Sequence, residues 1–282
     1  MLPKKYAALL LPLFLLLPAL LAGQVPWDKL ALADSLYRAN DFAGALEQYK
    51  PVLKFYNEKR TFHKAARCAA AVKDKKLAMG YLKKAADLGW SNARILQSDQ
   101  LLAPLASDGK FIRLIQRVEA FENRIKVLKT PALLGALDSI YADDQKYRGR
   151  RPDEKAQARL DSANFLRMQR LIGEHGWLGS NLLDGRNYCW LVIQRQSLEV
   201  QKQYYPMMAK AVKKGEEDPA FLAYLEDKIA VAQGEKQKYG TQVDAKNQKI
   251  YPLLDPEKVD LYRAKVGLSS IEILKKRYLI DR

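Results

Sequence analysis

The sequence is poor in the residues that bind metals and form disulfides. Its 282 residues include two cysteines, Cys68 and Cys189, and two histidines, His63 and His175. None of them has the close spacing of a zinc site, so we expect no metal and no cofactor. Both cysteines lie in apolar stretches, which favours small buried side chains. An oxidising compartment would also allow them to pair, and the sequence leaves this alternative open.

Signatures of common enzymes are missing too. There is no Gly-x-Ser-x-Gly elbow, no His-Glu-x-x-His helix and no phosphate-binding loop. The composition is 48% hydrophobic and 28% charged, with 15 glycines and 12 prolines. These values exclude a disordered chain, a collagen-like repeat and a disulfide-dense scaffold. A soluble globular protein without an obvious catalytic motif remains.

One apolar run stands at the amino terminus. Lys4 and Lys5 precede an uncharged, leucine-rich stretch from Ala7 to Ala22, which is interrupted by two prolines. A basic start, a short apolar segment and small residues at its end are typical of a secretory signal peptide, here residues 1–23. We therefore expect a periplasmic or extracellular protein with no transmembrane span after cleavage. An uncleaved membrane anchor is the alternative. Gln24 stands where a lipoprotein would have cysteine, so lipid attachment is not expected.

The chain is strongly basic, with 48 Lys and Arg against 32 Asp and Glu and a net charge of +16. Loss of the signal peptide would remove two lysines and leave +14. From Val25 to Lys129 there are 20 basic and 11 acidic residues, so the excess is richer in the amino-terminal part. No run of five like charges occurs, and an exported protein meets no genome. These features disfavour nucleic acid as a partner; a protein, a peptide, an anionic glycan or the envelope surface fits better.

Residues 24–129 contain an internal repeat. Two pairs of helical segments follow each other: Leu30–Arg38 with Phe42–Phe55, and Phe62–Val72 with Leu77–Leu88. The second helices align at Ala45 and Ala78, which are 33 residues apart. This period is typical of helix-turn-helix repeats of about 34 residues. The region resembles tetratricopeptide repeats. Because two repeats cannot bury a core alone, we expect them to pack on the rest of the chain.

Residues 130–282 are also predicted to be mainly helical. The segments Glu154–Glu174 and Leu198–Lys214 have helical patterns, and a helix from Pro219 to Gly234 has a cap at each end. The apolar run Tyr188–Ile193 has no usable period, and its length would allow a buried strand. Because it leads straight into a helical pattern, we expect a buried helix there. Asp144 and Arg148 are spaced for an intrahelical ion pair. Asp227 has apolar neighbours three and four residues away, so we expect it to be buried with a partner. The predicted fold is all-α, with helical hairpins packed on a multi-helix domain and at most a short β-hairpin.

Several fragments of this second region are familiar in combination. They are Asp144-Gln145-Lys146-Tyr147-Arg148, Gly176-Trp177, Ile193-Gln194, Ala223-Tyr224-Leu225-Glu226-Asp227-Lys228, Gln237-Lys238-Tyr239-Gly240-Thr241-Gln242 and Arg263-Ala264-Lys265-Val266-Gly267-Leu268. In this order, from about Leu133 to Leu274, they resemble the bacterial domain of unknown function 6624. The chain departs from that pattern at Arg195, Leu178 and Lys228, where histidine, proline and arginine are usual.

The resemblance implies a set of polar residues but no activity. The candidates for a polar cleft or a buried network are Asp144, Gln145, Arg148, Trp177, Gln194, Arg195, Asp227, Gln237, Tyr239, Thr241, Gln242 and Arg263. We expect an exported binding or scaffolding protein with a repeat platform and a polar cleft. The alternative is an envelope hydrolase with Asp144 and Asp227 as acid and base. Arg195 cannot serve as a base near neutral pH, so a hydrolase of this kind could be inactive in this member.

Overall fold

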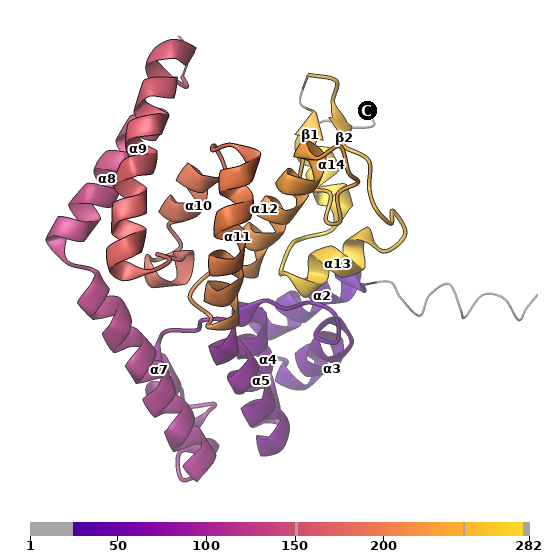
Figure 1. Cartoon of the computed structure of the whole chain (residues 1–282). Helices are drawn as coiled ribbons and strands as arrows, with labels where there is room; N and C mark the ends of the chain where they lie inside the picture. The colour runs from indigo at the N-terminus through magenta and orange to yellow at the C-terminus, as the bar shows by residue number, and fades with distance from the viewer. Residues whose placement is uncertain (1–24, 150–151, 245, 279–282) are drawn as a thin grey trace, which may run out of the picture.

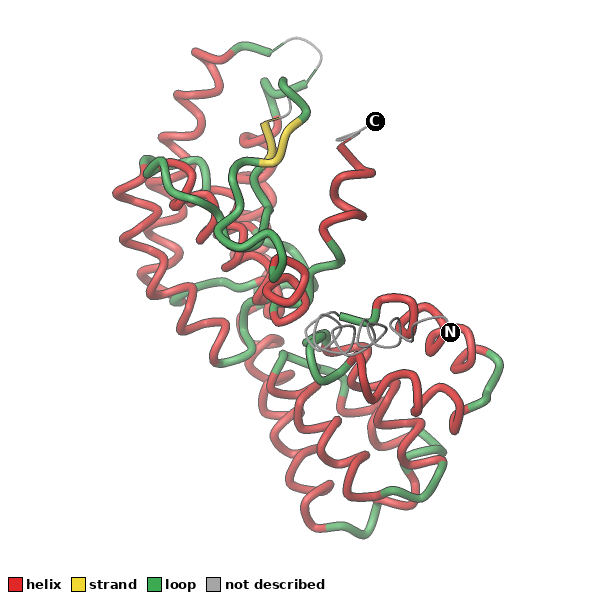
Figure 2. The backbone as a smooth tube through the Cα atoms, turned by 90° about the vertical axis from the view of Figure 1, so that its right-hand side faces the viewer, coloured by secondary structure: helices red, strands yellow, loops and turns green. Residues whose placement is uncertain are grey.

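The computed structural model describes residues 25–149, 152–244 and 246–278. The expected signal peptide, residues 1–23, lies outside these residues. The described residues form α-helices, two short 3-10 helices and one two-stranded antiparallel hairpin (Figure 1). The tube view shows the same preponderance of helix over strand (Figure 2). The prediction of a mainly α fold with at most a short hairpin is therefore confirmed.

The N-terminal unit, residues 25–129, surrounds an alanine-rich core. Its elements are α2 (Trp27–Arg38), α3 (Phe42–Val52), α4 (Lys59–Ala71), α5 (Lys75–Asp87), α6 (Ala93–Ser98), η1 (Ala103–Leu105) and α7 (Gly109–Leu128). Ala65, Ala66 and Ala69 on α4 are fully buried, so its neighbours can approach closely. The first four helices lie where the sequence predicts two hairpins; kinship with tetratricopeptide repeats remains a prediction.

The two hairpins share a turn geometry that explains where their helices end. Asn40 and Lys73 occupy equivalent turns 33 residues apart, and both have positive φ, 60° and 67°. The next residue in each turn caps the following helix: Asp41 accepts from the Gly44 N–H at 2.9 Å and Asp74 from the Leu77 N–H at 3.0 Å. These caps satisfy amide groups that have no partner within the helix.

The C-terminal unit, residues 130–278, has its own core and a small satellite core. Its elements are α8 (Pro131–Gln145), α9 (Glu154–His175), η2 (Ser180–Leu182), α10 (Tyr188–Ile193), α11 (Leu198–Lys213), α12 (Pro219–Ala232), β1 (Val243–Asp244), β2 (Lys249–Ile250), α13 (Val259–Lys265) and α14 (Ile271–Tyr278). Val243 pairs with Ile250 and Asp244 with Lys249. The satellite core beside this hairpin is built on Val259, Ile271 and Leu274.

Two details of this unit differ from the sequence expectation. The spacing of Leu133, Leu137, Ile140 and Tyr141 predicts an apolar stripe on α8 that continues into Asp144; these residues are buried except Tyr141, which is 50% exposed. Asp255-Pro256 has the pattern of a helix start, a capping residue followed by proline, and predicts a helix there, but α13 begins only at Val259. Asp255 caps a preceding turn, where its main-chain oxygen accepts from the Lys258 N–H at 3.2 Å.

Helix α7 and a polar seam join the two units. The first half of α7 packs in the N-terminal core, while Phe121, Ile125 and Leu128 pack against the C-terminal core. At the seam, the Asn181 amide donates to the carbonyls of Leu88 and Gly215, at 3.3 and 3.0 Å. A Cβ on Gly89 would lie 2.3 Å from the Gly215 carbonyl oxygen, so the main chains meet directly. The N-terminal and C-terminal units are therefore in direct main-chain contact at this seam.

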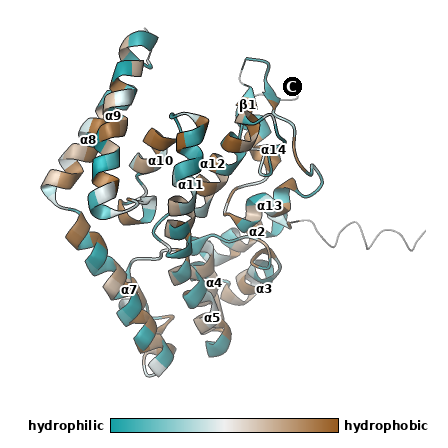
Figure 3. Cartoon of the chain, in the orientation of Figure 1, coloured by the Kyte–Doolittle hydropathy of each residue, from teal (hydrophilic) through white to brown (hydrophobic). Residues whose placement is uncertain are grey.

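Apolar residues alternate with polar ones around most helices, as their hydropathy shows (Figure 3). Within the described residues, no helix is both long and apolar enough to span a bilayer.

Cys68 and Cys189 are both buried and both unpaired. Burial raises the pKa of Cys68 to about 12, so its thiol stays protonated. The prediction of two small buried cysteines is therefore confirmed, and the alternative of a disulfide between them is not.

Candidate functional site

Asp144 lies in the last turn of α8 with only 2% of its side chain exposed. Its carboxylate accepts from Arg195 Nε at 2.8 Å and from Gln145 Nε2 at 2.6 Å. Arg148 Nη2 lies 3.5 Å from the same carboxylate, which confirms the predicted spacing-based ion pair. Arg195 belongs to the turn after α10, so Asp144 links two segments that are 51 residues apart.

Helix α9 supplies the second carboxylate of this region. Arg148 Nη2 donates to both oxygens of Asp161 at 2.5 Å, and its Nε donates to the Asp144 carbonyl at 2.7 Å. Gln157, which is buried, donates to Asp161 at 2.9 Å and accepts from the Tyr147 N–H at 2.9 Å. The end of α8 is thus held in place by side chains of α9.

Lys228 on α12 lies near enough to Arg195 for their charges to interact. We group it with the other residues as the Asp144 cluster: Asp144, Gln145, Arg148, Asp161, Arg195 and Lys228. Lys228 is half-buried, and its side chain makes no hydrogen bond or ion pair with any described residue. Burial lowers the pKa of its ammonium, and the nearby charge of Arg195 lowers that pKa further. Asp144 and Asp161 balance Arg148 and Arg195, so the charge of Lys228 is left uncompensated.

Asp227 is the centre of a second set of buried hydrogen bonds. It is fully buried, and its oxygens accept from the main-chain N–H groups of Lys238 (2.8 Å), Tyr239 (3.0 Å) and Thr241 (2.9 Å) and from the Thr241 hydroxyl (2.9 Å). The predicted burial of Asp227 is confirmed, and its partner is the main chain of the following turn. Gly240 has φ +65°, and a Cβ there would lie 2.7 Å from Ile271 Cδ1, so the turn needs glycine.

Gln237 and Arg263 hold the rest of this turn. The buried Gln237 amide donates to the carbonyls of Gln242 at 2.9 Å and Tyr251 at 2.8 Å, and it accepts from the Gln242 N–H at 2.8 Å. Arg263, 2% exposed, donates to the carbonyls of Tyr239 at 2.7 Å and Ser269 at 2.6 Å. We call this set the Asp227 network: Asp227, Gln237, Tyr239, Thr241, Gln242 and Arg263.

Sequence reasoning missed a third buried carboxylate, Glu217, which is 1% exposed. It accepts from the Trp177 indole at 2.8 Å, from the Asp218 N–H at 2.9 Å, and from both the N–H and the hydroxyl of Ser180. Burial raises the pKa of Glu217, and these donors oppose the rise. Its position just before the Asp218-Pro219 helix start is the one feature of the sequence that could have singled out Glu217.

The twelve candidate residues therefore fall into separate groups. The Asp144 cluster and the Asp227 network share no hydrogen-bond partner within the described ranges, and Trp177 belongs to the Glu217 site. Gln194 contributes its main-chain oxygen, which accepts from Gln201 Nε2 at 3.1 Å. No group of three or more His, Cys, Asp or Glu side chains in the described part of the chain could hold a metal ion.

Residues 152–281 match the profile of a family of unknown function, DUF6624. The match includes the Asp227 network, Arg195 and Lys228, and it begins after Asp144 and Arg148. The expected resemblance of the C-terminal region is supported from residue 152 onward rather than from Leu133. No curated protein and no solved structure matches the chain.

Proposed function

We propose that this chain is an exported binding protein whose C-terminal unit holds a carboxylate of a peptide or glycan ligand between Arg195 and Lys228. The helical hairpins of the N-terminal unit would form its platform. Lys228 carries this proposal, because it is a half-buried cation beside a second cation and has no partner among the described residues. A cation withdrawn from water without a counter-charge is costly, and a ligand carboxylate would offset that cost.

The lowered pKa of Lys228 is expected at a binding site for a carboxylate, because burial and Arg195 both disfavour the charge of the ammonium when no ligand is bound. Arg195 keeps 29% of its side chain exposed while one edge of its guanidinium is fixed on Asp144. An arginine held in this way can present its remaining donors to a carboxylate without first losing rotamer freedom.

The partners of Asp227 support binding rather than hydrolysis. A general acid or base has to reach the proton that it transfers. Both oxygens of Asp227 accept from donors of the 238–241 turn, and the residue is fully buried. Asp144 is likewise occupied by Arg195 and Gln145. Neither carboxylate is therefore poised for acid–base chemistry.

Export rests on the sequence of residues 1–23 alone. The test is to express the full chain in a bacterium and to determine the amino terminus of the mature protein by mass spectrometry. A start at Gly23 or Gln24 in the periplasm or medium supports export. An intact Met1 terminus in the cytoplasm refutes it.

Ligand binding is tested by thermal shift with acidic glycans such as oligogalacturonate and with short glutamate peptides that carry no apolar side chain for the α5–α7 groove described below, with neutral glycans as the reference. A bound ligand at about a hundredfold excess over its Kd stabilises the fold by about 2.7 kcal/mol. We expect the acidic ligands, and not the neutral ones, to raise the melting temperature. Lys228→Met should abolish the rise.

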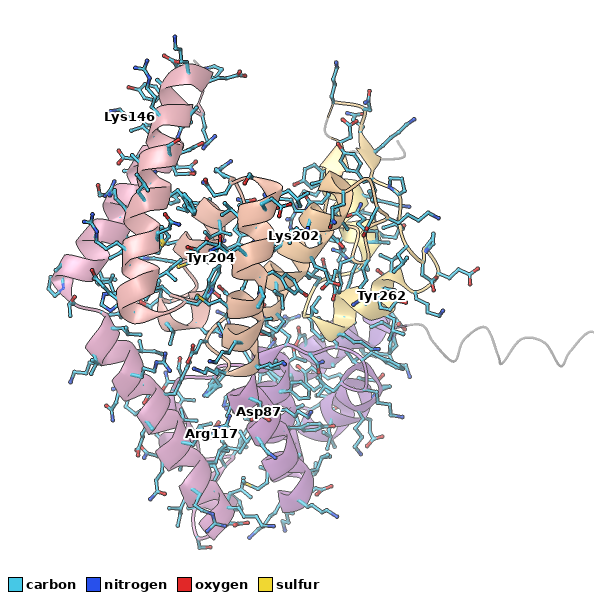
Figure 4. All side chains as sticks on the ribbon, viewed as in Figure 1. Asp87, Arg117, Lys146, Lys202, Tyr204 and Tyr262 are labelled. Atoms are coloured by element: carbon cyan, nitrogen blue, oxygen red, sulfur yellow. The ribbon has the colours of Figure 1, made fainter. Side chains whose placement is uncertain are left out.

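Lys202→Met is the matched control, since Lys202 on α11 is exposed and lies 3.7 Å from Glu199 (Figure 4). It should keep the ligand response. Without ligand, Lys228→Met should melt no lower than the unmodified protein, because a residue kept for binding at a cost in stability can be removed without loss. An equal response of both variants to the acidic ligands would refute the proposed site.

A further inference from the structure

A cavity of about 440 Å³ lies between α5 and α7 on the N-terminal unit. Helix α5 is the second helix of the second hairpin, and α7 is the long helix that reaches toward the C-terminal unit (Figure 1). The cavity is remote in sequence from the Asp144 cluster and shares no residue with it. We call it the α5–α7 groove.

The floor of the groove is aliphatic. Met79 of α5 and Leu114 of α7 line it, and Leu114 also belongs to the N-terminal core. Gly80 lies beside Met79 in the middle of α5, where a Cβ would meet no atom within 4 Å. The missing side chain at Gly80 therefore leaves room above the floor, and this room can accept an apolar side chain from outside.

The rim of the groove carries cations only. They are Lys76, Lys83, Lys110, Arg113 and Arg117. Arg117 is held by Asp87 at 2.7 Å, and the two side chains face each other between α7 and α5 (Figure 4). The side chains of the other four make no hydrogen bond or ion pair with the described residues.

Other cavities of the described residues have a different charge pattern. One includes Asp99, which lies 2.6 Å from Arg67, and another includes Asp138, which lies 3.4 Å from Arg186. A third contains Asp184 beside Lys59 and Arg60. No carboxylate lines the α5–α7 groove. Asp87 neutralises Arg117 alone, so the positive potential of the other four rim side chains remains and favours an anionic partner.

The shape of the groove distinguishes among anionic partners. Single-stranded nucleic acids stack their bases on aromatic side chains, and the lining has no aromatic residue. A phosphate backbone could contact the rim cations, but it offers no apolar group for the floor of Met79 and Leu114. A lipid surface is broad and contacts protruding cations, whereas here the apolar floor is recessed beneath the cations. A peptide that alternates apolar and acidic side chains can fill the recess and pair with the rim at once.

We propose that the α5–α7 groove binds an acidic peptide segment of a partner protein, with an apolar side chain over Gly80 and carboxylates on Lys83 and Arg113. This inference does not depend on the carboxylate site at Lys228. It gives the excess positive charge of the N-terminal unit a specific role in recognition.

The experiment is fluorescence anisotropy with the purified full chain and a labelled helical peptide of glutamate and leucine, in which leucine recurs every third or fourth residue. Lys83→Glu should weaken binding at least about tenfold, because a like charge replaces an attractive one. Lys84→Glu is the matched control: Lys84 is its exposed neighbour on α5 and does not line the groove. It should change the affinity less than about twofold, since exposed charges outside a contact count for little.

Gly80→Trp tests the shape independently of charge. The indole should fill the recess and abolish binding while the helical circular dichroism signal is unchanged. Equal binding by Lys83→Glu and Lys84→Glu, or unimpaired binding by Gly80→Trp, would overturn the proposal. So would preference for vesicles of anionic phospholipid or for a serine-for-leucine peptide. Lys228→Met should bind the peptide normally, so the two proposals fail separately.

Discussion

The two units of this chain are held together by different kinds of contact. The N-terminal core consists largely of alanine and other aliphatic side chains, and its buried polar side chains are Thr61 and His63. The C-terminal unit buries Asp144, Glu217 and Asp227, each with several donors. Close packing of small residues therefore specifies the first unit, whereas hydrogen bonds between distant segments specify the second.

The largest effect is expected in the second unit, from Asp227→Asn. The amide would place a donor against the Thr241 N–H and hydroxyl, which now donate to Asp227. We expect a loss of about 4 kcal/mol. Thermal melting followed by circular dichroism should show a decrease of about 8 to 16 °C. Asp41→Asn is the control, since asparagine caps a helix as well as aspartate does. A melting temperature of Asp227→Asn equal to that of this control would contradict the comparison.

Ala66→Leu tests the first unit in the same way. Ala66 is fully buried on α4, and extra volume in a close-packed core forces its neighbours apart. We expect a loss of about 3 kcal/mol in the free energy of unfolding measured with urea. Ala120→Leu on the exposed side of α7 should cost nothing measurable. If Ala66→Leu were equally harmless, packing would not be what specifies this unit.

His63 makes the N-terminal unit sensitive to acid. Burial lowers the pKa of His63 to about 4, and its ring stacks on Trp90 with centroids 4.1 Å apart. Below about pH 6.5 the unfolded chain takes up a proton that the folded chain refuses, so stability falls as the pH drops toward 4. Between pH 7 and pH 5 this loss is about 2 kcal/mol. His63→Phe keeps the stacked ring and should remove that part of the pH dependence. An unchanged dependence in urea titrations would show that His63 titrates normally.

The smallest expected effect is a gain. Gly80→Ala adds a methyl group into open space within α5, where alanine is favoured over glycine by about 1 kcal/mol. The melting temperature should rise by about 2 to 4 °C. Gly89→Ala provides the contrast, because its Cβ would lie 2.3 Å from the Gly215 carbonyl and its φ is +84°. A stabilising Gly89→Ala would mean that Gly89 and the Gly215 carbonyl are not in close contact.

Local signals in the sequence predicted much of the fold. The helix start at Pro219, the helix over Glu154–Glu174 and the burial of Asp227 follow from neighbouring residues, and the structure confirms each. Partners that are distant in sequence could not be predicted. The hydrogen bond between Asp144 and Arg195 spans 51 residues, and Glu217 meets Trp177 across 40. Such pairs depend on how helices dock, which no local spacing encodes.

Helix α7 has a consequence for any partner that engages both units. Its early turns line the α5–α7 groove and its late turns pack on the C-terminal core, while the main chains of Gly89 and Gly215 meet between the units. One continuous helix thus connects the groove to the unit that carries Lys228. A single extended ligand gains avidity only if the length between its two binding segments matches the separation of the groove and Lys228. The protein would then discriminate among ligands by their reach as well as by their charge.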